Sequence, residues 1–303
     1  MRIKTHKIIG VSAALLLAAA GTGFFALTRP DTVPAAPVAA EPIPETPPAA
    51  LPETEPVLTE ATEPEAPALP DALTRDGIRE LLLNSTDYFN TVSGDFLYTF
   101  NDEDGDLVVL SLDCDIDAST AETHVMAAYP TNLQEVKEGA EPVYDPAEVP
   151  WSRTQIADGT VCTLTDDLTG EVVRTSPVVK REQLTHDPLE KRFISHSDGT
   201  YSSYMRADPT NTYFARRILT PEELTFSLLC ATEDWTITGT EEYAGRECVV
   251  VAGTAPDFYK EKNDVSTYTM YVDRQSGIVL KFVGMNDAQQ ITKFTYTQRV
   301  EIS

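Results

Sequence analysis

The chain lacks the short motifs that mark common catalytic and metal sites. Its four histidines, His6, His124, His186 and His196, form no HExxH motif, and no pair of them has metal-ligand spacing. Nucleophile-elbow, dinucleotide-binding and phosphate-loop patterns are absent as well. The stretch at residues 195–198 holds triad residue types, but triads are assembled in space, so it is interpreted as a polar turn. The sequence therefore predicts no enzyme, with no catalytic, cofactor-binding or metal-binding residue and no cofactor.

Cysteine and positive charge are also scarce. The four cysteines, Cys114, Cys162, Cys230 and Cys248, form no CxxC pair, and each lies among apolar neighbours. Small buried thiols are favoured over disulfides, although four cysteines would allow three pairings outside the cytoplasm. Lys and Arg number 23 against 48 Asp and Glu, which gives a net charge of −25. That charge repels phosphate backbones and excludes nucleic acid as a partner.

One long apolar run is present, at residues 8–27. Twenty apolar residues form a helix of about 30 Å, which matches the hydrocarbon core of a bilayer. Arg2, Lys4 and Lys7 precede the run and only Arg29 follows it, which places the N-terminus in the cytoplasm. The run is therefore predicted to be a signal-anchor, with one N-terminal helix in the membrane as a partner.

Cleavage of residues 1–29 as a signal peptide is the alternative. Small residues before Gly21 would allow a cut near Ala20, which would give a secreted protein. The apolar run continues to Leu27, which is longer than an export signal needs and favours the anchor. The predicted location is the bacterial cell membrane, as a single-pass protein whose domain lies outside the cytoplasm.

Residues 30–72 have the composition of a disordered linker. Twelve of the 21 prolines lie between Pro30 and Pro70, and every charged side chain between Asp31 and Asp71 is acidic. Proline removes backbone donors and like charges repel, so the segment is predicted to be an extended stalk without a core.

Residues 73–303 are long enough for one domain with a sizeable core. A helix is predicted over residues 74–92, where Thr74 is the N-cap and an apolar stripe follows one face. A second helix is predicted over residues 220–231, because a Thr-Pro-Glu-Glu sequence forms a helix start signal.

Alternation with period two predicts strands through the rest of this domain. In the last of them, Phe294, Tyr296, Val300 and Ile302 are expected to share the buried face. Such alternation is typical of an antiparallel sheet with one wet and one buried face, so the fold class is α+β, a strongly curved antiparallel sheet covered by helices. The predicted strands are residues 95–100, 107–116, 123–129, 154–157, 160–165, 171–174, 235–242, 246–252, 266–272, 278–283 and 292–302.

The order of these elements resembles a known superfamily. The carrying segments are VSGDFLYTF, IADGTVCTLTDDLTGEVV, WTITGTEEYAGRECVVVAG, YTMYVDRQSGIVLKFVG and TKFTYTQRVEI. Together they resemble the bacterial LolA/LolB-like lipoprotein carriers, and more closely the N-terminal domain of the RseB/MucB-like periplasmic regulators. The resemblance covers residues 73–303 and is a pattern of strands and turns, not a catalytic signature.

The resemblance implies an incomplete β-barrel whose concave apolar face, lidded by helices, holds or senses the acyl chains of lipoproteins. The same apolar residues would also serve as ordinary core. The candidate ligand cavity would be lined by Ile78, Leu82, Phe89, Phe96, Tyr98, Phe100, Ile278, Leu280, Phe282, Phe294 and Tyr296.

Two functions are consistent with these observations. The first is a membrane-tethered extracytoplasmic domain that binds or senses a lipid, an acyl chain or a lipoprotein, with a role in envelope-stress signalling. The alternative is a protein-interaction module of the anti-sigma regulatory type, which would bind another envelope protein without a small ligand.

Overall fold

A computed structural model describes residues 67–101, 107–131, 138, 151–197 and 200–303. The predicted anchor and nearly all of the predicted stalk lie outside these residues. Within the described ranges, no helix combines the length and apolarity that crossing a membrane requires. The first described residues lead into the core directly, because Ala72 is already buried.

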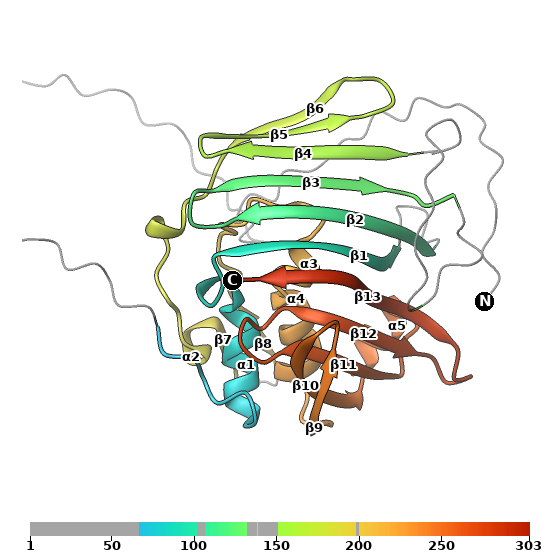
Figure 1. The fold of residues 1–303 in the computed structure, drawn as a ribbon. Coiled ribbons are helices and arrows are strands. Elements are labelled where there is room, and N and C mark those ends of the chain that lie inside the picture. The colour runs from blue at the N-terminus through green and yellow to red at the C-terminus, as the bar shows by residue number, and fades with distance from the viewer. Residues whose placement is uncertain (1–66, 102–106, 132–137, 139–150, 198–199) are drawn as a thin grey trace, which may run out of the picture. The chain divides into compact units, whose positions relative to one another are not determined.

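The domain is built on one antiparallel sheet of eleven strands, in the order β6-β5-β4-β3-β2-β1-β13-β12-β11-β10-β9 (Figure 1). The sheet does not close, and β6 and β9 are its two edges. The expected curved, open antiparallel sheet is confirmed. Its strands are β1 (Thr91–Asn101), β2 (Leu107–Asp117), β3 (Glu122–Ala128), β4 (Ser152–Asp158), β5 (Val161–Asp166), β6 (Val172–Pro177), β9 (Trp235–Tyr243), β10 (Arg246–Thr254), β11 (Thr267–Asp273), β12 (Val279–Met285) and β13 (Ile291–Ile302).

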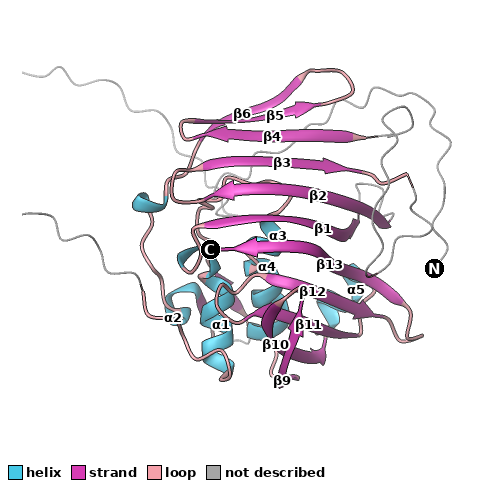
Figure 2. Cartoon of the chain, viewed as in Figure 1, coloured by secondary structure: helices cyan, strands magenta, loops and turns pink. Residues whose placement is uncertain are grey.

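Short helices gather against the part of the sheet that runs from β13 to β9 (Figure 2). A separate two-stranded hairpin, β7 (Phe193–Ser195) with β8 (Tyr201–Ser203), lies outside the large sheet. The remaining elements are α1 (Arg75–Leu83), η1 (Ser85–Asp87), η2 (Arg181–Gln183), α2 (Leu189–Arg192), α3 (Arg216–Leu219), α4 (Glu222–Leu224), the π-helical turn η3 (Thr225–Cys230) and α5 (Asp257–Asn263).

The first predicted helix begins where expected but is much shorter. Thr74 is its N-cap and accepts a hydrogen bond from the backbone N–H of Gly77. The helix ends at Leu83 rather than at residue 92, because the next side chains bind distant backbone carbonyls. The Nδ2 of Asn84 donates to the carbonyl of Asp187 at 3.0 Å, and the hydroxyl of Ser85 donates to that of Leu219 at 2.7 Å. These long-range bonds replace further α-helical turns, and only the 3-10 turn η1 follows.

The second predicted helix is broken into α4 and η3. Thr220 does not cap it: its hydroxyl donates to the carbonyl of Arg216 at 2.8 Å and so closes α3 instead. The helix α5 between β10 and β11 was not predicted at all. Ala244 and Gly245 both take positive φ angles in the tight turn that joins β9 to β10.

Candidate functional site

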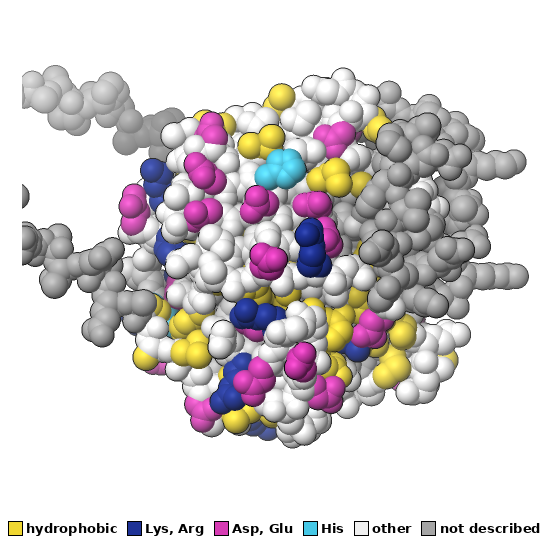
Figure 3. Space-filling model, in the orientation of Figure 1, with side chains coloured by type: hydrophobic (Ala, Val, Ile, Leu, Met, Phe, Trp, Pro, Cys, Tyr) yellow, Lys and Arg dark blue, Asp and Glu magenta, His cyan; other side chains and the backbone are white. Residues whose placement is uncertain are grey.

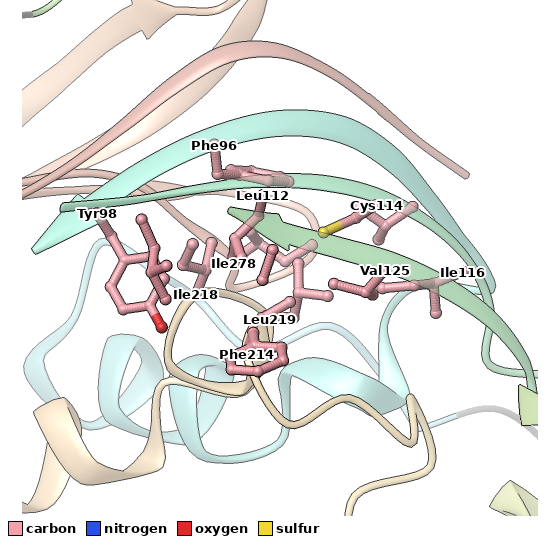
Figure 4. Packing of buried hydrophobic residues seen from close by; sticks show 14 of the residues in the cluster. Phe96, Tyr98, Leu112, Cys114, Ile116, Val125, Phe214, Ile218, Leu219 and Ile278 are labelled. Atoms are coloured by element: carbon pink, nitrogen blue, oxygen red, sulfur yellow. The ribbon is translucent and has the colours of Figure 1, made fainter. Parts of the chain in front are cut away.

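Buried apolar side chains cover part of the concave face of the sheet. Phe214, Ile218 and Leu219 lie beneath β1 to β3 and contact the side chains that these strands turn inward (Figure 4). Phe96 and Leu112, on two of these strands, have no exposed surface. The side chains of Phe214, Ile218 and Leu219 thus lie in the interior for which a ligand cavity is predicted, and the cavity itself stays a prediction.

The eleven predicted cavity residues do not form one site. Phe89, Phe96, Tyr98, Ile278 and Leu280 belong to a first buried cluster, together with Phe214. The residues Ile78, Leu82 and Phe282 belong to a second cluster, which joins α1 and η3 to the strands β10 to β12. Phe294 and Tyr296 form a third cluster with Leu97 and Val109, and the side chain of Phe100 lies outside the described part of the structure.

The predicted orientation of Phe294 and Tyr296 is wrong. Between Asp95 and Phe96 the register against β13 shifts by one residue, so Gln298 is an extra residue in that strand. A one-residue insertion turns every following side chain to the other face. Phe294 and Tyr296 therefore face away from the helices, whereas Val300 and Ile302, beyond the bulge, pack against the first cluster.

Hydrogen bonds hold the loop at residues 210–213, which leads into Phe214, against β3 and β4. Gln155 on β4 donates from Nε2 to the carbonyl of Asn211 and accepts from the backbone N–H of Tyr213 at 2.8 Å. Thr123 on β3 donates its hydroxyl to the carbonyl of Thr210. The inner face of β3 and β4 thus carries buried polar groups that match this loop, which is the pattern of a structural contact rather than of a bare apolar hollow.

A cluster of buried charges lies where α1, α2 and α4 meet. The guanidinium of Arg192 is fully buried and pairs with Glu222, whose side chain is 4% exposed. Arg206 binds Asp87 through two bonds of 2.8 and 2.9 Å. Arg192 also donates to the backbone carbonyls of Leu83 and Tyr204, each at 2.8 Å. Burial lowers the pKa of Arg192 and the carboxylate of Glu222 opposes this shift, so the two charges depend on each other.

A small pocket borders this cluster. It encloses about 200 Å³ but has space for about one water-sized molecule. The Oδ2 of Asp208 and the Nε of Arg216 are buried beside it and make no hydrogen bond within the described structure. Burial raises the pKa of Asp208. The pocket suits a bound water and is far too small for an acyl chain.

A hairpin that is anchored at its base presents apolar side chains to solvent. Ile194, Tyr201, Tyr204 and Met205 lie in or beside the β7–β8 hairpin and are between 39% and 55% exposed. Its base is fixed, because Phe193 stacks on Phe226 with ring centroids 6.3 Å apart and Arg192 holds the carbonyl of Tyr204. The hairpin and Arg192 lie in the segment over residues 184–218, which has no clear periodicity in the sequence.

At one end of the concave face, Tyr98 of β1 and Lys293 of β13 lie near Arg217 of α3. Tyr98 and Lys293 are each 7% exposed. Burial lowers the pKa of Lys293 to about 8, and the charge of Arg217 adds to this effect. Burial raises the pKa of Tyr98, and the positive charge of Arg217 opposes this shift. The structure thus places two cationic side chains and a phenol at this end of the interior.

Replacing Lys293 by methionine is expected to stabilise the fold at neutral pH. The lysine has a lower pKa folded than unfolded, so its protonation favours the unfolded chain below pH 8, and this cost fades as the pH rises toward 10. Lys293→Met should therefore exceed the wild type by on the order of 1–2 kcal/mol at pH 7, and by less at pH 10. Urea unfolding at both pH values measures the gap, with the exposed Lys262→Met as control. A gap that is constant with pH would contradict this assignment.

The described residues contain no candidate metal site and no disulfide bond. No group of three or more His, Cys, Asp or Glu side chains there is arranged to hold a metal ion. All four cysteines are free thiols, and Cys114, Cys162 and Cys248 are buried. Burial raises the pKa of Cys230 and Cys248 to about 12, so these thiols are poor nucleophiles at neutral pH.

No protein-family model and no curated protein matches this chain. Several solved structures are similar to it. They include MucB in the MucA/MucB complex of Pseudomonas aeruginosa, at 16% identity and a TM-score of 0.34 over 76% of this chain and 57% of that one. LppX of Mycobacterium tuberculosis aligns at 12% identity and a TM-score of 0.33, over 76% and 93% of the two chains. LprF of Mycobacterium bovis aligns at 14% and 0.31, over 75% and 91%.

The chain spans a little more than half of the MucB chains that it matches. The similar structures include MucB and an outer-membrane lipoprotein-sorting domain from Vibrio parahaemolyticus.

Proposed function

We propose that the chain is a membrane-tethered binding domain of the bacterial envelope and that its ligand is another protein. The observation that carries this proposal is the exposed apolar surface of the β7–β8 hairpin, formed by Ile194, Tyr201, Tyr204 and Met205. Several large exposed apolar side chains on one short segment are a feature of interaction sites. An anti-sigma factor is the type of partner to which the sequence resemblance points.

The packed interior supports a protein ligand over a lipid. An acyl chain needs an apolar hollow, and Phe214, Ile218 and Leu219 are buried against the described concave face, where they would compete with it for space. A protein partner can bind the outside of the domain and needs no rearrangement of this core.

Site-specific crosslinking in intact cells tests the proposal. A photo-crosslinking residue in place of Tyr204 should capture one protein in stoichiometric yield. The same residue in place of Thr169, which is exposed in the β5–β6 turn, is the control and should capture none. Equal capture at both positions, or no protein captured from Tyr204, would overturn the proposal.

Binding of a lipid, an acyl chain or a lipoprotein is the second candidate. It is favoured by the position of Lys293 and Arg217 at one end of the apolar interior, where an anionic head group would be neutralised. An acyl chain would have to displace Phe214. Native mass spectrometry of the full chain purified from its host should then show a bound lipid that is lost in Lys293→Met. A spectrum without lipid in the wild type would argue against this candidate.

A further inference from the structure

The edge strand β9 carries an acidic stretch that is open to pairing. Among the described strands, β9 pairs only with β10, so the hydrogen-bonding groups along its other side have no strand partner there (Figure 1). A bulge near Gly239 divides the strand. Beyond it, Thr240, Glu241 and Glu242 are all exposed. An unpaired strand edge is a ready template for another extended chain.

A shallow depression accompanies this stretch. It encloses about 400 Å³ and is lined by Thr240, Glu241, Glu242, Gly245 and Glu247. Three of its five lining residues are thus glutamates.

Two of the three glutamates are held in place by neighbours. The hydroxyl of Tyr271 donates to Glu241 at 3.0 Å, and Arg274 pairs with Glu247 at 2.9 Å. No hydrogen bond or ion pair ties the side chain of Glu242 within the described structure. Only Glu247 has a cationic partner, so the stretch keeps the negative charges of Glu241 and Glu242.

The two edges of the sheet differ in how they resist pairing. β6 is six residues long, ends on Pro177 and carries Arg174, which are common devices that protect an edge. β9 contains no Pro, Lys or Arg. Two copies of β9 side by side would bring Glu241 and Glu242 close to the same glutamates of the other copy, and these like charges oppose self-association. The edge stays open to a strand of opposite charge.

The acidic side chains of the domain are not confined to this edge. Figure 3 shows Asp and Glu side chains spread over the face turned to the viewer, with fewer Lys and Arg. A cationic partner would therefore be attracted to the domain as a whole, and the position of binding must come from the unpaired backbone of β9.

We propose that β9 binds an extended, lysine- or arginine-rich segment of a partner protein as an added strand along Thr240–Tyr243. Backbone hydrogen bonds would give the pairing, and Glu241, Glu242 and Glu247 would select positive charge. The inference rests on the proposed function in that the partner is a protein, and it names the chemistry of the segment that is bound.

Fluorescently labelled peptides and the full chain test the inference. An eight-residue peptide of alternating Lys and Val is expected to bind and to slow hydrogen exchange at residues 240–243. The same peptide with Glu for Lys should not bind. A Lys–Val peptide with N-methyl groups on every second residue should also fail, because it cannot donate to the edge. Equal binding of the N-methylated peptide would overturn strand addition.

Charge-matched variants separate the edge from the overall charge. Glu241→Lys with Glu242→Lys is expected to weaken Lys–Val binding about tenfold or more. Glu122→Lys with Glu171→Lys makes the same change in net charge at exposed positions elsewhere and should have a much smaller effect. Equal losses in the two double variants would overturn a site at β9. If the wild-type chain binds no Lys–Val peptide but the crosslinker at position 204 still captures a protein, only the site at β9 is refuted. If the crosslinker at position 204 captures no protein, the proposed function is refuted.

Discussion

Glu222→Gln is expected to lower the free energy of unfolding by about 3 kcal/mol, because it leaves the buried guanidinium of Arg192 without a countercharge. Glu222 is 4% exposed and also receives the backbone N–H of Arg206 at 3.0 Å and a 3.3 Å contact from Arg216. Glutamine keeps the shape and one acceptor oxygen, so the change removes the charge and replaces the second acceptor by an amide N–H. Since natural domains have only about 5–15 kcal/mol of stability, the loss is large.

The neighbouring glutamate supplies a matched control. Glu223 is 47% exposed and pairs with Arg217 at 3.3 Å, so Glu223→Gln should change stability by less than about 0.5 kcal/mol. Urea unfolding of both variants gives the comparison. Hydrogen exchange should also quicken in the β7–β8 hairpin of Glu222→Gln, because Arg192 holds its base. If the two variants lose the same amount, the buried pair does not stabilise the domain.

Gly277→Ala should be similarly damaging, at about 3 kcal/mol or more. Gly277 ends the turn between β11 and β12 with a φ of +76°. A Cβ there would lie 2.5 Å from the carbonyl oxygen of Leu81, which belongs to the buried helix α1. Neither backbone can yield without opening the core, so strain and overlap add.

Gly245→Ala isolates the conformational part of that cost. Gly245 has nearly the same φ, +75°, but a Cβ there would meet nothing within 4 Å. Its replacement should therefore cost only about 1–2 kcal/mol, from the left-handed conformation itself. Thermal unfolding of both variants tests the difference. A Gly277→Ala variant no less stable than Gly245→Ala would show that α1 does not press against the turn.

The strands could be predicted from the sequence because alternation is a local signal. The pairs β9–β10 and β11–β12 lie within two residues of the predicted ranges, and the turns that join them contain Gly245 and Gly277 at positive φ. Helix ends could not be predicted in the same way. The helix α1 stops because Asn84 and Ser85 bind carbonyls more than a hundred residues away, and periodicity contains no information on such partners.

The candidate site was harder to predict for two physical reasons. A bulge leaves no mark in the pattern of apolar residues, so the single extra residue Gln298 inverted the expected faces of Phe294 and Tyr296. The hairpin and the buried Arg192–Glu222 pair depend on long-range charge pairing. In the sequence, Arg192 and Glu222 look like ordinary surface residues of short helices.

The strand order has a consequence for how the chain is made. β1 lies beside β13 at the centre of the sheet, where Arg299 contacts Asp95 from 204 residues away. All of the remaining strands must therefore be synthesised before the central pair of β1 and β13 can form. The two halves of the sheet are expected to remain separate, with their inner faces open to water, until the last twelve-residue strand arrives. Such distant pairing makes for slow folding and gives chaperones a long interval in which to act.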